Sequence, residues 1–205
     1  NNIFFFIQTD KIFSQTNNSI IISVGNNPIT RLDLLKEIKL IAILSNTQIN
    51  DVNQEQIKAL AVKSLIKRNI KNNEIKKRNI NKYNKKQLDA LIDNACKKLE
   101  VDRNGLKNIL DRYNLSYENL IKKFQVDLKW NYMIFEMYKN KISLNTSEIE
   151  NKINLYLENS KGINKEEDIK LIKEKIVNQE KEKKLKMFSN LHYSNLERST
   201  QIKFL

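Results

Sequence analysis

The side chains that could do chemistry in this sequence are few, and their spacing does not suit catalysis. His192 is the only histidine and Cys96 the only cysteine, which excludes sites built from two imidazoles or two thiolates. The sequence also lacks Walker, G-x-G-x-x-G and paired-cysteine motifs. Carboxylates between Glu166 and Glu182 alternate with lysines, as is typical of ion pairs on a solvated helix face. We therefore expect no enzymatic activity, no metal site and no cofactor.

The remaining candidate for function is a wide band of methionine and aromatic side chains that follows Ser116. Thioether and aromatic groups suit a surface that accepts many apolar partners, because they are polarizable and adaptable. A helix at the centre of a bundle would carry the same band as buried core, so two interpretations stay open. Under the first, the candidate groove residues are Trp130, Met133, Ile134, Met137, Phe124 and Tyr138.

Composition favours a helical protein and leaves the meaning of its charge open. The 205 residues include only three glycines and one proline, so there is little material for β-turns. The formal net charge of +13 suits nucleic acid or an anionic membrane, but it also fits a general excess of Lys, Asn and Ile. The cations are mostly lysines scattered along the chain, so we expect no nucleic-acid partner. No apolar run is long enough to span a membrane.

The positions of turn-forming and helix-capping residues predict an N-terminal strand followed by five helices. The strand covers 19–24, and a turn at 25–28 leads to a helix over 31–45 that is capped by Thr30 and Asp33. Helices are then expected over 54–79, after Asn84, after Asp102 and after Ser116. Cys96 falls beside an apolar stripe and is expected to be a buried small hydrophobe.

The second half predicts a helix after Asn145, a linker at 158–165, a highly charged helix over 166–191 and a strand at 200–204. A single strand needs a partner, so the two ends of the chain are expected to pair. The predicted fold is mainly α, with a small two-stranded ribbon formed by the N- and C-terminal strands. Residues 1–18 form either a remnant of an export signal or a flexible segment. Residues 19–205 form one domain, with 19–158 as its N-terminal helical part and 166–205 as a returning helix and strand.

In the order and spacing of these elements the chain resembles the N-terminal region of SurA-type periplasmic chaperones from about Ser19 to Leu157. The resemblance includes the strand-turn-helix start, the segment QLDALIDNACKKLEVDRNGLKNIL and the run SLNTSEIE. Residues 166–205, ending in FSNLHYSNLERSTQIKFL, resemble the C-terminal helix and strand that complete the N-terminal fold in that family. Typical members place parvulin domains between the two parts, and the eight residues 158–165 leave no room for one.

The resemblance implies an ATP-independent holdase in the periplasm that binds unfolded outer-membrane proteins and lacks prolyl isomerase activity. Two alternatives come from other classes of protein. One is a basic helical module that binds nucleic acid, and the other is a structural or assembly subunit that holds a partner with the 166–191 helix. The chain is expected to be a monomer, or a dimer that exchanges the 166–205 segment.

Overall fold

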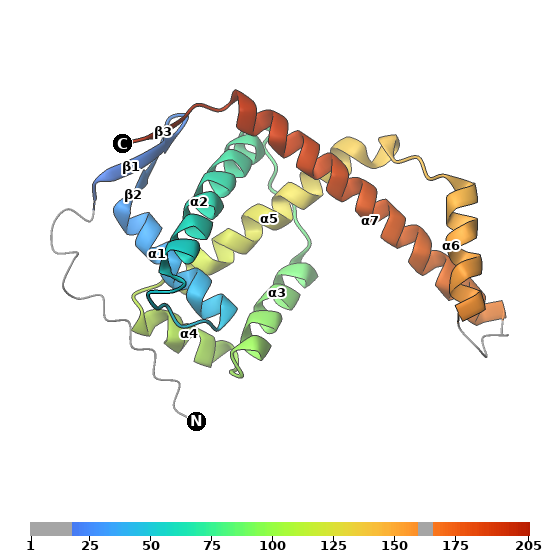
Figure 1. Cartoon of the computed structure of the whole chain (residues 1–205), viewed down its shortest axis with the longest axis horizontal. Coiled ribbons are helices and arrows are strands. Elements are labelled where there is room, and N and C mark those ends of the chain that lie inside the picture. The colour runs from blue at the N-terminus through green and yellow to red at the C-terminus, as the bar shows by residue number, and fades with distance from the viewer. Residues whose placement is uncertain (1–17, 160–165) are drawn as a thin grey trace. The chain divides into compact units, whose positions relative to one another are not determined.

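The computed structural model describes residues 18–159 and 166–205, and most of this part of the chain is helical (Figure 1). The predicted N-terminal segment 1–18, apart from its last residue, and most of the predicted linker 158–165 lie outside the described residues. The helices are α1 (Arg31–Ser45), α2 (Gln54–Lys77), α3 (Lys85–Lys98), α4 (Arg103–Arg112), α5 (Tyr117–Tyr138), α6 (Thr146–Asn159) and α7 (Glu166–Ser199), with a short 3-10 helix at Lys139–Lys141. The mainly helical fold class is confirmed.

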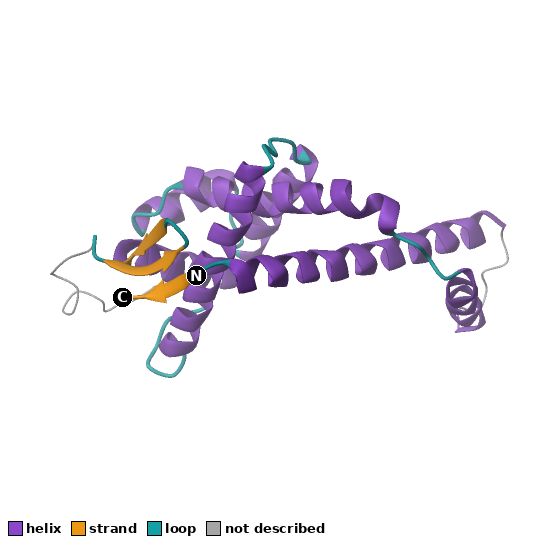
Figure 2. Ribbon diagram, turned by 90° about the horizontal axis from the view of Figure 1, so that it is seen from above, coloured by secondary structure: helices purple, strands orange, loops and turns teal. Residues whose placement is uncertain are grey.

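Three strands form a small antiparallel sheet in the order β2-β1-β3 (Figure 2). They are β1 (Ile20–Val24), β2 (Asn27–Thr30) and β3 (Ile202–Phe204). The predicted pairing of the two ends is confirmed, since Ile22 lies opposite Phe204 and Val24 opposite Ile202. The predicted two-stranded ribbon omits β2, because its first two residues fall in the predicted turn at 25–28 and Thr30 was predicted only as a helix cap.

Strand β2 forms because the reversal takes only two residues. Gly25 adopts a φ of +57°, a left-handed conformation that glycine reaches without strain, and the chain pairs again from Asn27. Pro28 has no backbone N–H, but β2 lies at the edge of the sheet, where a missing donor is tolerated. The sheet therefore accommodates the only proline of the chain.

Helix starts follow the predicted capping residues. At α1, the Thr30 Oγ1 accepts from the backbone N–H of Asp33 at 3.1 Å, and the Asp33 carboxylate accepts from the Thr30 N–H at 2.8 Å. Asn84 caps α3 and Asp102 caps α4. The side-chain oxygen of each residue accepts a hydrogen bond from the backbone N–H three residues later in the chain. α7 continues eight residues beyond its predicted end, because 192–199 contains neither glycine nor proline to stop it.

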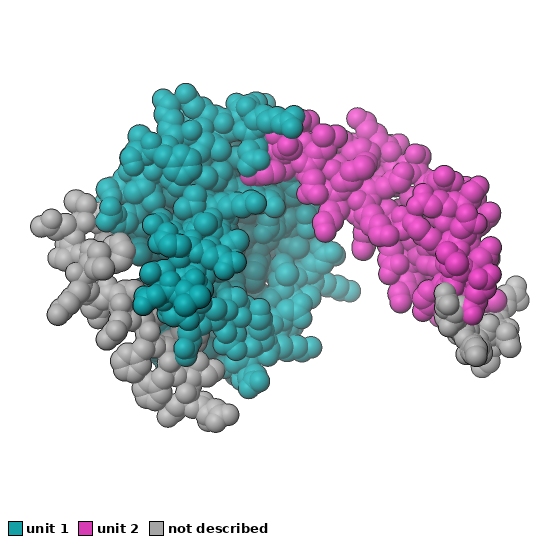
Figure 3. All heavy atoms as spheres, in the orientation of Figure 1, with its two compact units in different colours: residues 1–132, 196–205 teal, residues 133–195 magenta. Residues whose placement is uncertain are grey.

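The chain divides into two compact units (Figure 3). Unit 1 comprises residues 1–132 and 196–205, and unit 2 comprises residues 133–195. The division falls within α5 and near the end of α7.

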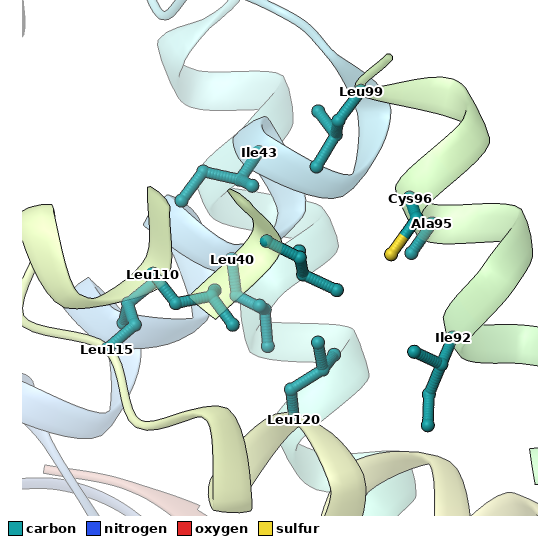
Figure 4. Packing of buried hydrophobic residues seen from close by; sticks show 10 residues of the cluster. Leu40, Ile43, Ile92, Ala95, Cys96, Leu99, Leu110, Leu115 and Leu120 are labelled. Atoms are coloured by element: carbon teal, nitrogen blue, oxygen red, sulfur yellow. The ribbon is translucent and has the colours of Figure 1, made fainter. Parts of the chain in front are cut away.

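Unit 1 holds the larger apolar core, which is built where α1, α3, α4 and the start of α5 converge (Figure 4). Leu106, Leu110 and Leu120 are completely buried there. Cys96 is also buried in this cluster, as predicted. Leu60 of α2, in contrast, is 50% exposed.

Unit 2 is mainly α6 and most of α7, and its buried cluster is small. Ile153 of α6 packs with Ile172 and Ile176 of α7, and Ile149 and Leu157 lie partly buried against them. Lys152 supports this contact by pairing with Glu180 across the two helices at 3.1 Å. Toward the other end of α7, the Tyr138 ring stacks on Phe188 with 4.7 Å between centroids, and the Tyr138 hydroxyl lies 3.0 Å from Nδ1 of His192.

Candidate binding surfaces

Three of the six predicted groove residues are buried, which corrects the expectation that they line an exposed surface. Trp130, Met133 and Ile134 are only 1–2% exposed. The Trp130 ring also carries the Lys71 ammonium over its face, 5.5 Å from the centroid. The alternative interpretation of the methionine and aromatic band, as buried core, therefore holds for these three residues.

The other three predicted residues are half-buried and do not lie in one unit. Phe124 belongs to unit 1 and packs against its apolar core. Met137 and Tyr138 belong to unit 2, and the Tyr138 ring is covered on one face by Phe188. The six residues thus do not form a shared open groove within either unit.

Unit 2 instead exposes large apolar side chains that the sequence analysis did not choose. They are between 42% and 61% exposed, and they are Phe135, Leu155, Tyr156, Leu171, Met187 and Leu191. Met187 and Leu191 lie one helical turn apart on α7, so they share a face. The sequence contains a signal for this exposure. The run NQEKEKK, which precedes Met187, has no apolar residue and is typical of a helix segment that is surrounded by solvent.

A second apolar feature is a groove of about 530 Å³ in unit 1, between α2 and β3. Ala59, Val62 and Ile66 line it from the helix, and Ile202 and Phe204 line it from the strand. Phe204 is 70% exposed. The described part of unit 1 thus offers apolar surface next to an edge strand.

The feature that sequence reasoning missed most completely is a buried ion cluster around Glu37 of α1. The Glu37 side chain is 4% exposed. Its carboxylate accepts from Ser64 Oγ at 2.6 Å, from Arg68 and from Lys123 Nζ at 2.7 Å. Glu37 lies three residues after Leu34 and three before Leu40, so its position within the apolar stripe was the available signal.

The electrostatics of Glu37 depend on these partners. Burial by itself raises the pKa of the carboxyl, but the charges of Arg68 and Lys123 and the hydrogen bonds from Lys123 and Ser64 outweigh it. The net result is a pKa below the ordinary value of 4.5. Glu37 is therefore a buried carboxylate held in its charged form.

A cleft of about 530 Å³ opens beside this cluster, between α1, α2 and α5 of unit 1. Its lining includes Glu37, Arg68 and Lys123 together with apolar side chains such as Leu40 and Leu120. Further lysines, side-chain amides and the Asp33 carboxylate also line it. The cleft combines charge and apolar surface, as pockets for organic ligands commonly do.

Neither a candidate metal site nor a candidate membrane span is found among the described residues. No group of three or more His, Cys, Asp or Glu side chains there could hold a metal ion. None of the helices described is long and apolar enough to cross a bilayer. His192 bonds to Tyr138 within unit 2.

No protein-family model matches the sequence, and no curated protein matches it.

Replacing Glu37 by glutamine is expected to lower the free energy of unfolding by about 3 kcal/mol, because the change leaves Arg68 and Lys123 without their buried counter-charge. Chemical denaturation measures the loss. The matched control is Glu55→Gln on α2, where the carboxylate is 79% exposed and pairs with Lys58 at 3.6 Å, and where we expect a loss below about 0.5 kcal/mol. Equal losses in the two variants would contradict the structural role of the cluster.

The same carboxylate predicts a pH dependence. Because the folded-state pKa of Glu37 is lowered, its stabilisation is complete above the ordinary value of 4.5 and is lost as the pH falls through the folded-state pKa. The difference in unfolding free energy between the wild type and Glu37→Gln should therefore shrink as the pH falls below 4.5. Denaturation at a series of pH values measures it. A difference that stays constant down to the acid transition would show that Glu37 does not titrate in this way.

Trp130→Ala is expected to destabilise the protein by about 4 kcal/mol, because it removes a ring that is 1% exposed and leaves a cavity. Thermal and chemical unfolding measure the change, with Leu60→Ala on the 50% exposed position of α2 as control, expected below about 1 kcal/mol. If Trp130→Ala left stability unchanged, the ring would belong to the surface and the original groove would regain support.

Proposed function

We propose that this chain is the core of an ATP-independent periplasmic chaperone that holds unfolded outer-membrane proteins and has no prolyl isomerase activity. Its sequence resemblance to SurA-type chaperones suggests the class of client and the compartment. The observation that carries the proposal is the set of exposed apolar side chains on unit 2.

Unit 2 buries few of its large apolar side chains. Ile153, Ile172 and Ile176 form a cluster between α6 and α7, and Met133 and Ile134 of α5 are also buried. Met187 and Leu191 on α7 are 54% and 55% exposed. Large exposed apolar surfaces mark interaction sites in soluble proteins. A methionine adapts to differently shaped partners, which suits a surface that must accept many unfolded sequences.

Weak apolar contacts also explain how such a protein could work without nucleotide. Burying a half-exposed Met or Leu contributes on the order of 1 kcal/mol, so a client held by a few such contacts dissociates readily. The net charge of +13 adds a long-range attraction for acidic segments of a client. A client released in this way can fold or insert elsewhere.

An assembly subunit would use the same exposed side chains for one permanent partner, and affinity purification distinguishes the two. A chaperone returns many unfolded clients in low yield, whereas a subunit returns one partner in fixed proportion. A nucleic-acid-binding module would instead show an affinity that falls steeply with salt.

We expect the purified protein, without nucleotide, to suppress the aggregation of a urea-denatured outer-membrane barrel protein at near-stoichiometric ratio. Met187→Gln with Leu191→Gln should weaken the apparent client affinity about tenfold, because two half-exposed apolar contacts are lost. Light scattering after dilution from denaturant measures both effects.

The control variant for this assay is Val52→Gln with Leu60→Gln, which removes two exposed apolar side chains from unit 1. We expect the control to retain wild-type suppression, and circular dichroism should show all proteins folded. Absence of suppression at severalfold excess of wild type would end the proposal. An equal loss in both double variants would remove unit 2 from it.

A further inference from the structure

The cleft between α1, α2 and α5 carries more positive than negative charge. Its cations come from all three helices, and they are Lys36, Arg68, Lys122, Lys123 and Lys129. The two carboxylates of its lining, Asp33 and Glu37, are both already engaged. Asp33 accepts from the backbone N–H and hydroxyl of Thr30 in the cap of α1.

The excess charge begins in the buried cluster itself. Arg68 and Lys123 are 23% and 17% exposed and share the single carboxylate of Glu37. Two partly desolvated cations on one carboxylate leave one positive charge without an equal counter-charge. Charges removed from water are normally balanced, so this cluster favours a second anion.

Two further lysines of the lining, Lys36 and Lys129, add to this preference. Lys36 and Lys129 make no ion pair with another described residue, whereas Lys122 pairs with Glu118 at 2.8 Å. Lys36 and Lys129 are half-buried, so their charges are screened less than those of fully exposed lysines. An anion in the cleft would be attracted by both ammonium groups as well as by Arg68 and Lys123, since all four side chains line it.

The size and walls of the cleft indicate what carries the anion. Its volume of about 530 Å³ exceeds what a single inorganic ion needs and lies in the usual range of organic ligands, roughly 300–1,000 Å³. Leu40, Leu115 and Leu120 contribute apolar wall beside the cations. Such a lining suits a carboxylate that is attached to an apolar group.

We propose that this cleft binds the carboxylate of an acidic residue within a peptide segment, with the ammonium groups of Lys36 and Lys129 and the excess charge of Arg68 and Lys123 as its counter-charges. The inference rests on the proposed function only in taking the ligand to be a polypeptide. It adds to the apolar surface of unit 2 a second site, which selects client segments that carry a negative charge.

The test uses two fluorescently labelled peptides of identical sequence, one with a central glutamate flanked by leucines and the other with glutamine in its place. Fluorescence anisotropy with the full chain at low ionic strength should show the glutamate peptide binding about tenfold more tightly. Lys36→Gln with Lys129→Gln should remove that preference. A control pair with the same change of net charge, Lys86→Gln with Lys98→Gln on the exposed face of α3, should keep it.

Equal binding of the two peptides, or equal loss in the two lysine pairs, would overturn the proposal, because only the general charge of the protein would then be at work. Inorganic phosphate serves as the competitor. If phosphate displaced the peptide at concentrations near the dissociation constant of the peptide, the ligand would be a free anion and the peptide assignment would be wrong.

The aggregation assay separates this proposal from the proposed function. Lys36→Gln with Lys129→Gln should lose the glutamate preference and still suppress aggregation through unit 2. Met187→Gln with Leu191→Gln should weaken suppression and leave the glutamate preference intact.

Discussion

Glu37 is a buried carboxylate that three helices share, and this constraint organises unit 1. Its partners Ser64 and Arg68 lie on α2 and Lys123 lies on α5, so one side chain of α1 fixes the positions of both neighbours. Apolar contacts tolerate small shifts, but a desolvated charge must meet its partners at hydrogen-bond distance. The other buried charged residues follow the same rule, since Lys71 pairs with Asp127 and Glu74 with Arg78.

This arrangement explains why the helix that looked most like a binding surface is largely core. Lys71 of α2 meets both Asp127 and the Trp130 ring on α5, so α2 covers part of the wide apolar band. Trp130, Met133 and Ile134 of the band are buried, and the exposed apolar side chains on which the proposed function rests lie elsewhere on unit 2. There the solvated middle of α7 contributes little to a core, and Met187 and Leu191 remain exposed after it.

Local chemistry made much of the fold predictable. Helix starts are predictable at Thr30, Asn84 and Asp102. At each of them a side-chain oxygen accepts a hydrogen bond from a free backbone N–H of the first turn. The pairing of β1 with β3 followed from the need of an isolated strand for a partner. Strand β2 was missed because Gly25 and Pro28 indicate a turn, and a single sequence does not show whether the chain pairs again after two residues.

The candidate site was less predictable, and the reason is physical. A wide apolar band is the same in sequence whether neighbours cover it, as at Trp130, or leave it half open, as at Met137. A glutamate within an apolar stripe signals a buried charge only if its partners are known. Arg68 and Lys123 lie 31 and 86 residues away, so their convergence on Glu37 exists only in the fold.

The central claim is that clients bind to exposed side chains of unit 2 and not to the buried band of α5. The chain contains three methionines, of which Met133 is 1% exposed, Met137 half-buried and Met187 54% exposed. Methyl NMR of the methionine-labelled, otherwise unaltered protein can therefore follow all three during titration with an unfolded barrel protein. The account predicts a large shift or broadening of the Met187 signal with Met133 unchanged. A response of Met133 with Met187 unchanged would contradict it.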